Sequence, residues 1–131
     1  MKYIVWFSCL LLFSCKTDDD VKLANKWTLD SYIKNSVSTV TNVTFPLYFT
    51  FKKDNVVQVD LNVNNCEGLY EKASETIILN NFNCTKLCCD SSASIEAYEL
   101  FIDSVKTYHI NGKTLKLKGD HGTVMQFSLV E

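Results

Sequence analysis

The side chains best suited to chemistry in this 131-residue chain are four cysteines of its second half: Cys66, Cys84, Cys88 and Cys89. Thiols can form disulfides, ligate a metal ion or carry redox chemistry. A zinc site needs four ligands, with thiolate sulfurs about 2.3 Å from the ion, and no motif places His109 or His121 beside these cysteines. The spacing Cys84-x-x-x-Cys88-Cys89 also differs from the Cys-x-x-Cys of disulfide oxidoreductases. The spacing thus supports neither a metal site nor a redox motif.

Cys15 stands in a different context, at the end of an apolar run. Tyr3 to Phe13 is apolar except for Ser8, Lys2 precedes it, and Leu12-Phe13-Ser14-Cys15 ends it. The run is well short of the roughly 20 residues that a membrane-spanning helix needs. This arrangement resembles the signal peptide and lipobox of bacterial lipoproteins, in which the cysteine is lipidated and becomes the mature N-terminus.

That resemblance implies a lipoprotein signal peptide over residues 1–14 and an acylated tether over 15–21. Two or more acyl chains on Cys15 anchor a protein stably in a membrane. The run Asp18-Asp19-Asp20 resembles the acidic signal that exports lipoproteins of the Bacteroidota to the cell surface. Lys16 stands where an aspartate would signal inner-membrane retention in enteric bacteria. We therefore expect a lipid-anchored protein of the outer membrane, displayed on the cell surface.

Export also bears on the cysteines, because exported proteins meet an oxidising environment. Cys9 leaves with the signal peptide and Cys15 is acylated, so four of the six cysteines remain. An even number in an exported protein favours disulfides over metal binding. We expect structural disulfides and no metal or cofactor. Four cysteines allow three pairings, among which these arguments do not choose.

The composition points to one folded domain over residues 22–131 that does not bind nucleic acid. The apolar fraction is 47% and the net charge is −2, and all 13 basic residues are lysine. Arginine, which is absent, is the usual bidentate partner of phosphate and of guanine. With four glycines and one proline, many turns must use Asn, Asp or Ser.

Period-two alternation of apolar residues predicts strands along most of the domain. Trp27-x-Leu29 begins the pattern, and residues 47–51 and 57–63 form a hairpin around Lys53-Asp54-Asn55. Asn111-Gly112 is a strong hairpin signal. The remaining expected strands cover 67–71, 76–80, 108–110, 115–117 and 125–129.

Between these strands the period changes to that of one helix, near 92–106. Ile95, Tyr98, Ile102 and Val105 share a helical face, with Phe101 beside them. Asp90, Ser91 or Ser92 can cap its start. We expect a β-rich α+β fold: a curved antiparallel sheet or open (cracked) barrel of about 7–8 strands with one helix.

Other candidates for catalysis have simpler structural roles. His121 lies in a Gly-flanked turn and His109 alternates outward on a strand, while Glu96, Glu99 and Asp103 follow the spacing of a solvated helix face. The chain lacks a Gly-x-Ser-x-Gly nucleophile elbow. We expect no enzymatic activity.

From Leu23 to the C-terminus the chain resembles the META-domain family, which includes heat-inducible outer-membrane lipoproteins. The motifs that carry the resemblance are Trp27-x-Leu29, Phe49-x-Phe51 before Asp54, Cys66-x-Gly68-x-Tyr70, Thr85 followed by Cys89, Tyr98 with Ile102 and Val105, Tyr108-x-Ile110 and Leu115-x-Leu117. The resemblance implies an envelope location and a Cys66–Cys89 bridge. Cys84–Cys88 would then close a small loop.

Two roles follow for such a domain. The first is a structural or interaction role with a protein partner, served by the surface of the domain. The alternative is a lipocalin-like module that binds a small apolar ligand or an acyl chain, for which Trp27 near the mature start is a weak signal. A lined internal cavity would favour ligand binding, whereas a filled core would favour the surface role.

Overall fold

Strands paired with their sequence neighbours make up most of the computed structural model, which describes residues 22–35 and 39–131. The predicted signal peptide, Cys15 and the tether lie outside the described residues. The elements are β1 (Lys26–Ile33), β2 (Thr41–Asn42), β3 (Tyr48–Phe51), β4 (Val56–Asp60), β5 (Asn65–Ala73), β6 (Thr76–Cys84), α1 (Ser92–Ser104), β7 (Val105–Asn111), β8 (Thr114–Gly119), the 3-10 turn η1 (Asp120–Gly122) and β9 (Val124–Leu129).

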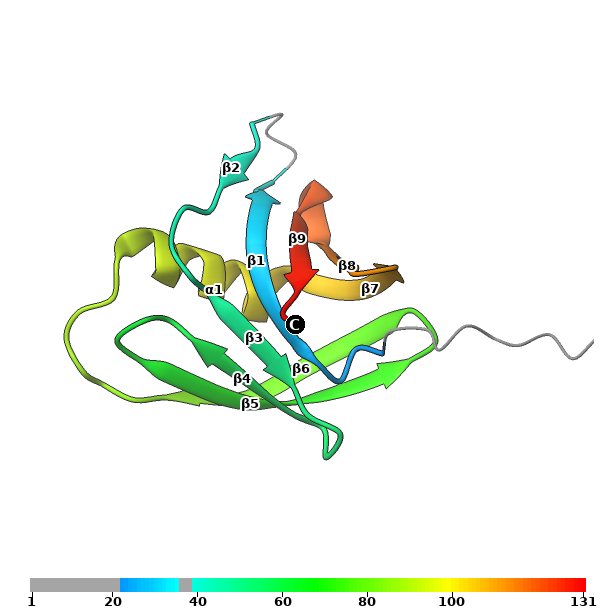
Figure 1. Cartoon of the computed structure of the whole chain (residues 1–131), viewed down its shortest axis with the longest axis horizontal. Helices are drawn as coiled ribbons and strands as arrows, with labels where there is room; N and C mark the ends of the chain where they lie inside the picture. The colour runs from blue at the N-terminus through cyan, green and yellow to red at the C-terminus, as the bar shows by residue number, and fades with distance from the viewer. Residues whose placement is uncertain (1–21, 36–38) are drawn as a thin grey trace, which may run out of the picture.

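The strands close into an antiparallel barrel (Figure 1). The order is β1-β3-β4-β5-β6-β7-β8-β9, and β9 pairs back onto β1 from Trp27↔Leu129 to Ile33↔Val124. The short β2 adds one further pairing to β1. The predicted β-rich α+β fold with a barrel and one helix is therefore confirmed. The pairing of β9 with β1 leaves neither strand with a free edge there, where another chain could pair.

The ring of strands has one weak seam, between β6 and β7. The only ladder pair described there is Thr76↔Thr107, although the backbone N–H of Tyr108 also donates to the carbonyl of Glu75 at 2.8 Å. Helix α1 connects these two strands in the chain, and the rings of Tyr98 and Phe101 on the helix lie 6.0 Å from the ring of Phe82 on β6.

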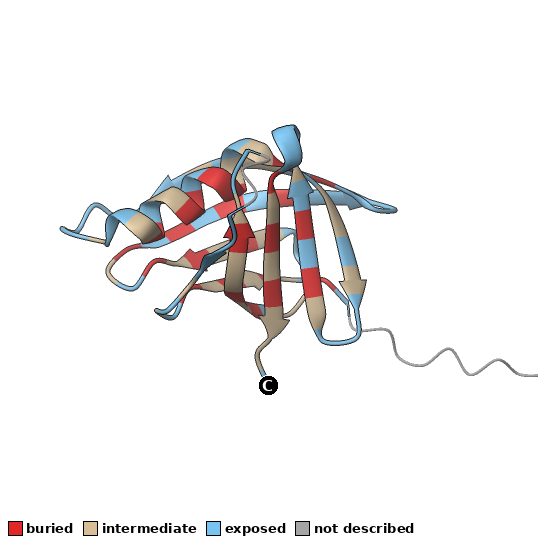
Figure 2. Cartoon of the chain, turned by 90° about the horizontal axis from the view of Figure 1, so that it is seen from above, coloured by how far each residue is buried: buried red, intermediate tan, exposed pale blue. Residues whose placement is uncertain are grey.

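The barrel interior is filled by large apolar side chains. Figure 2 shows buried positions alternating with more exposed ones along the strands. Trp27, Phe49, Phe101 and Phe127 are fully buried. The ring of Phe49 meets those of Phe101 and Phe127 edge to face, at 4.8 and 5.0 Å between centroids. Such pairs add stability beyond the area that they bury.

The helix buries most of the predicted face, since Tyr98, Phe101 and Val105 are buried and Ile102 packs against the core. Ser94, Ala97, Leu100 and Phe101 join Tyr98 in the buried set, whereas Ile95 keeps 41% of its surface exposed. Small side chains at two of these positions let the helix approach the sheet closely, which brings the ring of Phe101 to Phe49. The prediction was wrong only for Ile95, because the pattern weighted hydrophobicity over the fit of small side chains.

The start of the helix and several turns use the expected residues. Ser91 is the N-cap, and its hydroxyl accepts from the backbone N–H of Ser94 at 3.1 Å. Positive φ angles occur at Asn35, Asn55 and Ser74, where another protein would commonly use glycine. Asparagine tolerates this left-handed conformation better than most residues.

The contact of α1 with the core predicts a large effect of Phe101→Ala. Truncation of a fully buried phenylalanine removes about 3–5 kcal/mol of stability, and here it also detaches the helix from the aromatic cluster. Urea denaturation of the variant should show a much lower midpoint. Ile95→Ala on the same helix is the matched control and should change stability by less than about 1 kcal/mol. Equal midpoints for both variants would contradict the proposed packing.

Candidate functional site

The densest polar cluster of the described chain lies where the β4–β5 turn meets the segment between β6 and α1. We call it the Asn64 junction: Asn64, Thr85, Leu87 and Asp90. Asn64 is only 9% exposed. Its Nδ2 donates to the carbonyl of Leu87 and to Oδ2 of Asp90, both at 2.7 Å. Its Oδ1 accepts from the backbone N–H of Leu87 and from the hydroxyl of Thr85, both at 2.8 Å.

Asp90 completes the junction from the helix side. Its Oδ1 accepts from the backbone N–H groups of Val63 at 2.8 Å and Asn64 at 3.2 Å. Desolvation of the Asp90 carboxylate acts to raise its pKa, but the hydrogen bonds from Asn64 and Val63 together outweigh desolvation and hold the pKa below its ordinary value. Asp90 was one of three candidates for the helix cap; Ser91 takes that role, and Asp90 instead ties two loops together.

The structure pairs Cys66 with Cys84, which corrects the predicted Cys66–Cys89 and Cys84–Cys88 bridges. The two residues face each other in the β5–β6 ladder with their Cα atoms 4.0 Å apart. Cys89 lies beyond the end of β6, between Leu87 and Asp90 of the Asn64 junction. It pairs instead with its neighbour Cys88. The disulfide character of all four cysteines agrees with the sequence-based expectation.

A β-bulge brings Cys84 opposite Cys66. The register shifts by one residue between Glu67 and Leu69, and Asn81 on the facing strand has a positive φ of 55°. A one-residue shift moves a side chain to the other face of a strand, so an unbroken hairpin would place Asn83 opposite Cys66. Gly68 makes room for this bulge, since a Cβ there would lie 2.6 Å from the ring of Phe82.

The histidines are separated from the cysteines and from each other. His109 is exposed on β7, with its Nδ1 3.9 Å from a carboxylate oxygen of Glu75, and His121 lies in the exposed turn η1. Within residues 22–35 and 39–131, no three side chains of His, Cys, Asp or Glu are grouped as a metal site would require.

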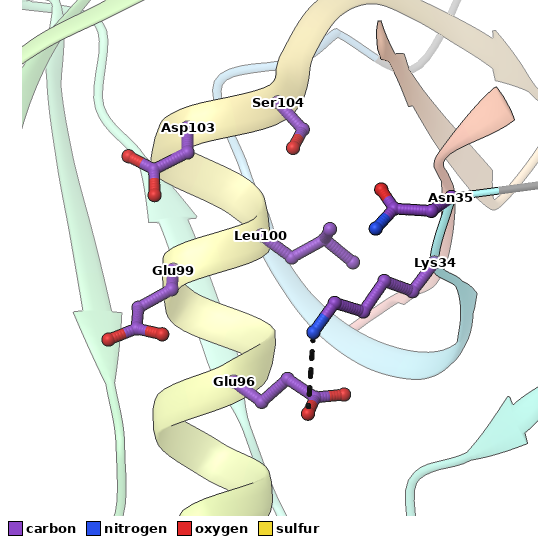
Figure 3. A pocket seen from close by; sticks show the side chains of 7 residues that line it. All are labelled: Lys34, Asn35, Glu96, Glu99, Leu100, Asp103 and Ser104. Atoms are coloured by element: carbon purple, nitrogen blue, oxygen red, sulfur yellow. Dashed lines mark ion pairs between the residues drawn. The ribbon is translucent and has the colours of Figure 1, made fainter. Parts of the chain in front are cut away.

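A shallow polar groove of about 200 Å³ runs along α1 (Figure 3). Lys34 and the helix residues Glu96, Glu99 and Asp103 line it. The Lys34 ammonium lies 3.7 Å from Glu96, whose other carboxylate oxygen accepts from the hydroxyl of Tyr32 at 3.0 Å. Burial and this hydrogen bond raise the pKa of Tyr32. Glu99 and Asp103 are exposed, as their helical spacing indicated.

The Asn64 junction was not foreseen from the sequence. Its contacts join residues more than 20 positions apart, and an asparagine in a polar turn carries no periodic signal.

Among the described residues, no helix combines the length and the apolar composition needed to cross a bilayer.

Comparison with known proteins identifies a family and a fold. Residues 20–131 match the META domain profile, which covers most of the chain. No curated protein matches the chain.

Three solved structures share the fold at low sequence identity. A protein from Burkholderia xenovorans aligns with a TM-score of 0.68 and 15% identity over 82% of both chains. A DUF4847 family protein from Bacteroides vulgatus aligns with a TM-score of 0.61 and 16% identity, over 80% of this chain and 92% of that one. A further NMR structure aligns with a TM-score of 0.57 and 14% identity, over 81% of this chain and 89% of that one.

The Cys66–Cys84 bridge predicts a clear loss of stability in Cys66→Ala/Cys84→Ala. The bridge joins residues 18 positions apart, and closing a loop of that length contributes about 3 kcal/mol in the chain-entropy model. The melting temperature should fall by roughly 10 °C. Cys88→Ala/Cys89→Ala is the matched control, because neighbouring residues close no loop. A similar loss in both variants would contradict this assignment.

The lowered pKa of Asp90 predicts a pH-dependent effect of Asp90→Asn. At pH 7 the variant should lose roughly 1–3 kcal/mol, since the hydrogen bonds then lack a charged acceptor. The folded-state pKa is depressed, so this stabilisation is fully present above the ordinary pKa near 3.8 and is lost as pH falls through the lower folded-state pKa. Urea titrations at pH 7, 5 and 3 should show a constant gap between wild type and variant at the first two values and a smaller gap at the third. A gap that widens toward pH 3 would contradict this sign.

Proposed function

Because the chain belongs to the META-domain family, we propose that it is a non-catalytic envelope lipoprotein, anchored through Cys15 in the outer membrane and displayed on the cell surface. The observation that carries this proposal is the sequence around Cys15: an apolar run after Lys2, a lipobox-like Leu12-Phe13-Ser14-Cys15 and an acidic stretch. Residues 1–14 would be removed as the signal peptide.

The position of the first buried residue supports close attachment to the membrane. Leu23 is 1% exposed and belongs to the core, so the domain begins directly after residues 15–21. Seven residues span at most about 25 Å when fully extended. An anchor on Cys15 would therefore hold the domain near the lipid surface, with its acidic tether between them.

The packing of the barrel supports a role for the outer surface rather than the interior. Trp27, Phe49, Phe101 and Phe127 are fully buried and fill the space that a lipocalin-like ligand would need. Outward, Leu69, Ile78 and Leu87 are 42%, 58% and 64% exposed. Exposed apolar side chains of this kind can contribute to a contact with another protein. We therefore favour an interaction or structural role over ligand binding in the barrel.

The proposed anchor predicts that Cys15→Ser abolishes lipidation. In cells fed an alkyne analogue of palmitate, the wild-type protein should carry the label and be recovered with membranes after a carbonate wash. Cys15→Ser should carry no label, because the acylated thiol is missing. Labelling in cells and mass spectrometry of the N-terminal peptide measure both outcomes.

Cys9→Ser is the matched control, since Cys9 would leave with the signal peptide. It should label as the wild type does. Equal labelling of Cys15→Ser and wild type would overturn the lipoprotein proposal. Protease added to the intact wild-type cells tests the surface placement separately, because a domain that survives until lysis would instead face the periplasm.

A further inference from the structure

The two disulfides of the domain differ in exposure and surroundings. Cys66 is 1% exposed within β5, whereas its partner Cys84 is an exposed residue at the end of β6, with its sulfur 3.4 Å from the hydroxyl of Tyr98 on the helix. Cys88 and Cys89 are both exposed and belong to no strand or helix. They lie in the long loop between β6 and α1, drawn in yellow-green at the left of Figure 1. Both residues of the second pair are therefore open to an incoming thiolate, whereas in the first pair Cys66 is closed to it.

The Asn64 junction holds both flanks of this exposed pair. Leu87 precedes the pair, and its N–H and C=O both bond to the Asn64 side chain. Asp90 follows the pair and is bound by Nδ2 of the same asparagine. None of these bonds involves Cys88 or Cys89. Breaking the disulfide therefore removes no contact that fixes the loop, and the two sulfurs remain close together after reduction.

The two disulfides also differ in how much each stabilises the folded domain. Cys66–Cys84 joins positions 18 apart and restricts the unfolded chain, whereas Cys88–Cys89 joins neighbours and restricts it hardly at all. Opening the first bridge loosens the β5–β6 hairpin. Opening the second changes only the two side chains and leaves the barrel intact.

We propose that Cys88–Cys89 is a surface site for reversible thiol–disulfide exchange with dithiol reductants, and that Cys66–Cys84 is a structural bridge that does not take part. A thiolate of the dithiol attacks one sulfur of the pair, forms a mixed disulfide and releases the other sulfur as a thiolate, which takes up a proton. The second thiol of the reductant then attacks the mixed disulfide and frees the remaining cysteine. Two electrons and two protons pass to the pair, and the dithiol becomes a disulfide. This site goes beyond the proposed anchoring role and does not depend on it.

Graded reduction of the full chain tests the proposal. The protein is first equilibrated with excess oxidised glutathione, then exposed to increasing dithiothreitol, and free thiols are alkylated at each step. Trypsin cleaves after lysine and so separates the cysteines, with Cys66 in peptide 54–72, Cys84 in 73–86 and the pair in 87–106. Peptide 87–106 should gain two alkyl groups at a reductant concentration at least tenfold lower than that which separates 54–72 from 73–86. Circular dichroism should not change at the first step, and renewed oxidised glutathione should restore the pair.

Three results would overturn the proposal: free thiols in 87–106 after the oxidising step, reduction of both bridges together, or loss of folded structure when only the pair is reduced. The variant Cys88→Ser/Cys89→Ser is the control. In this variant the first reduction step should be missing. The second step, reduction of Cys66–Cys84, should occur at the same dithiothreitol concentration as in the wild type. If the first reduction step persists in this variant, dithiothreitol reduces another group at that step, and the assignment to Cys88–Cys89 is wrong.

Discussion

The insertion of α1 between β6 and β7 is the constraint on which the rest of the structure depends. Two strands that pair at only one position cannot seal a barrel, so the helix must supply the missing core. It does so with Phe101, whose ring lies against Phe49 of β3 and is also 6.0 Å from that of Phe82 on β6. The helix thus packs against β6 on one side of the seam and against β3 in the core through aromatic contacts.

The same insertion explains why a polar junction lies beside an apolar core. The chain has to leave β6, cross to the helix start and pass the β4–β5 turn, and its backbone groups there cannot join a ladder. Buried polar groups without partners are costly. Asn64 satisfies those of Leu87 and Asp90 satisfies those of Val63 and Asn64 itself. One asparagine and one aspartate thereby replace the hydrogen bonds that a strand would have provided.

These features leave the outer surface of the domain as the part that other molecules can reach. A barrel interior filled by aromatic side chains leaves the loop that carries Cys88 and Cys89, the groove along α1 and the outer face of β5 and β6 as the surfaces open to other molecules. The aligned structures share this fold at only 14–16% identity.

The sequence by itself determined the strands, the helix and its cap region, because alternation and helical period depend on neighbours within a few residues. It also identified a domain of the META family and predicted disulfides among the four cysteines. Tertiary structure alone decided the partner of Cys66, because one bulge opposite Gly68 shifts the register and turns Cys84 toward it. It also decided that Ser94 and Ala97, not Ile95, complete the buried face of α1, and it decided the role of Asn64. Each of these depends on the fit of side chains that lie far apart in the chain, and no local pattern records such a fit.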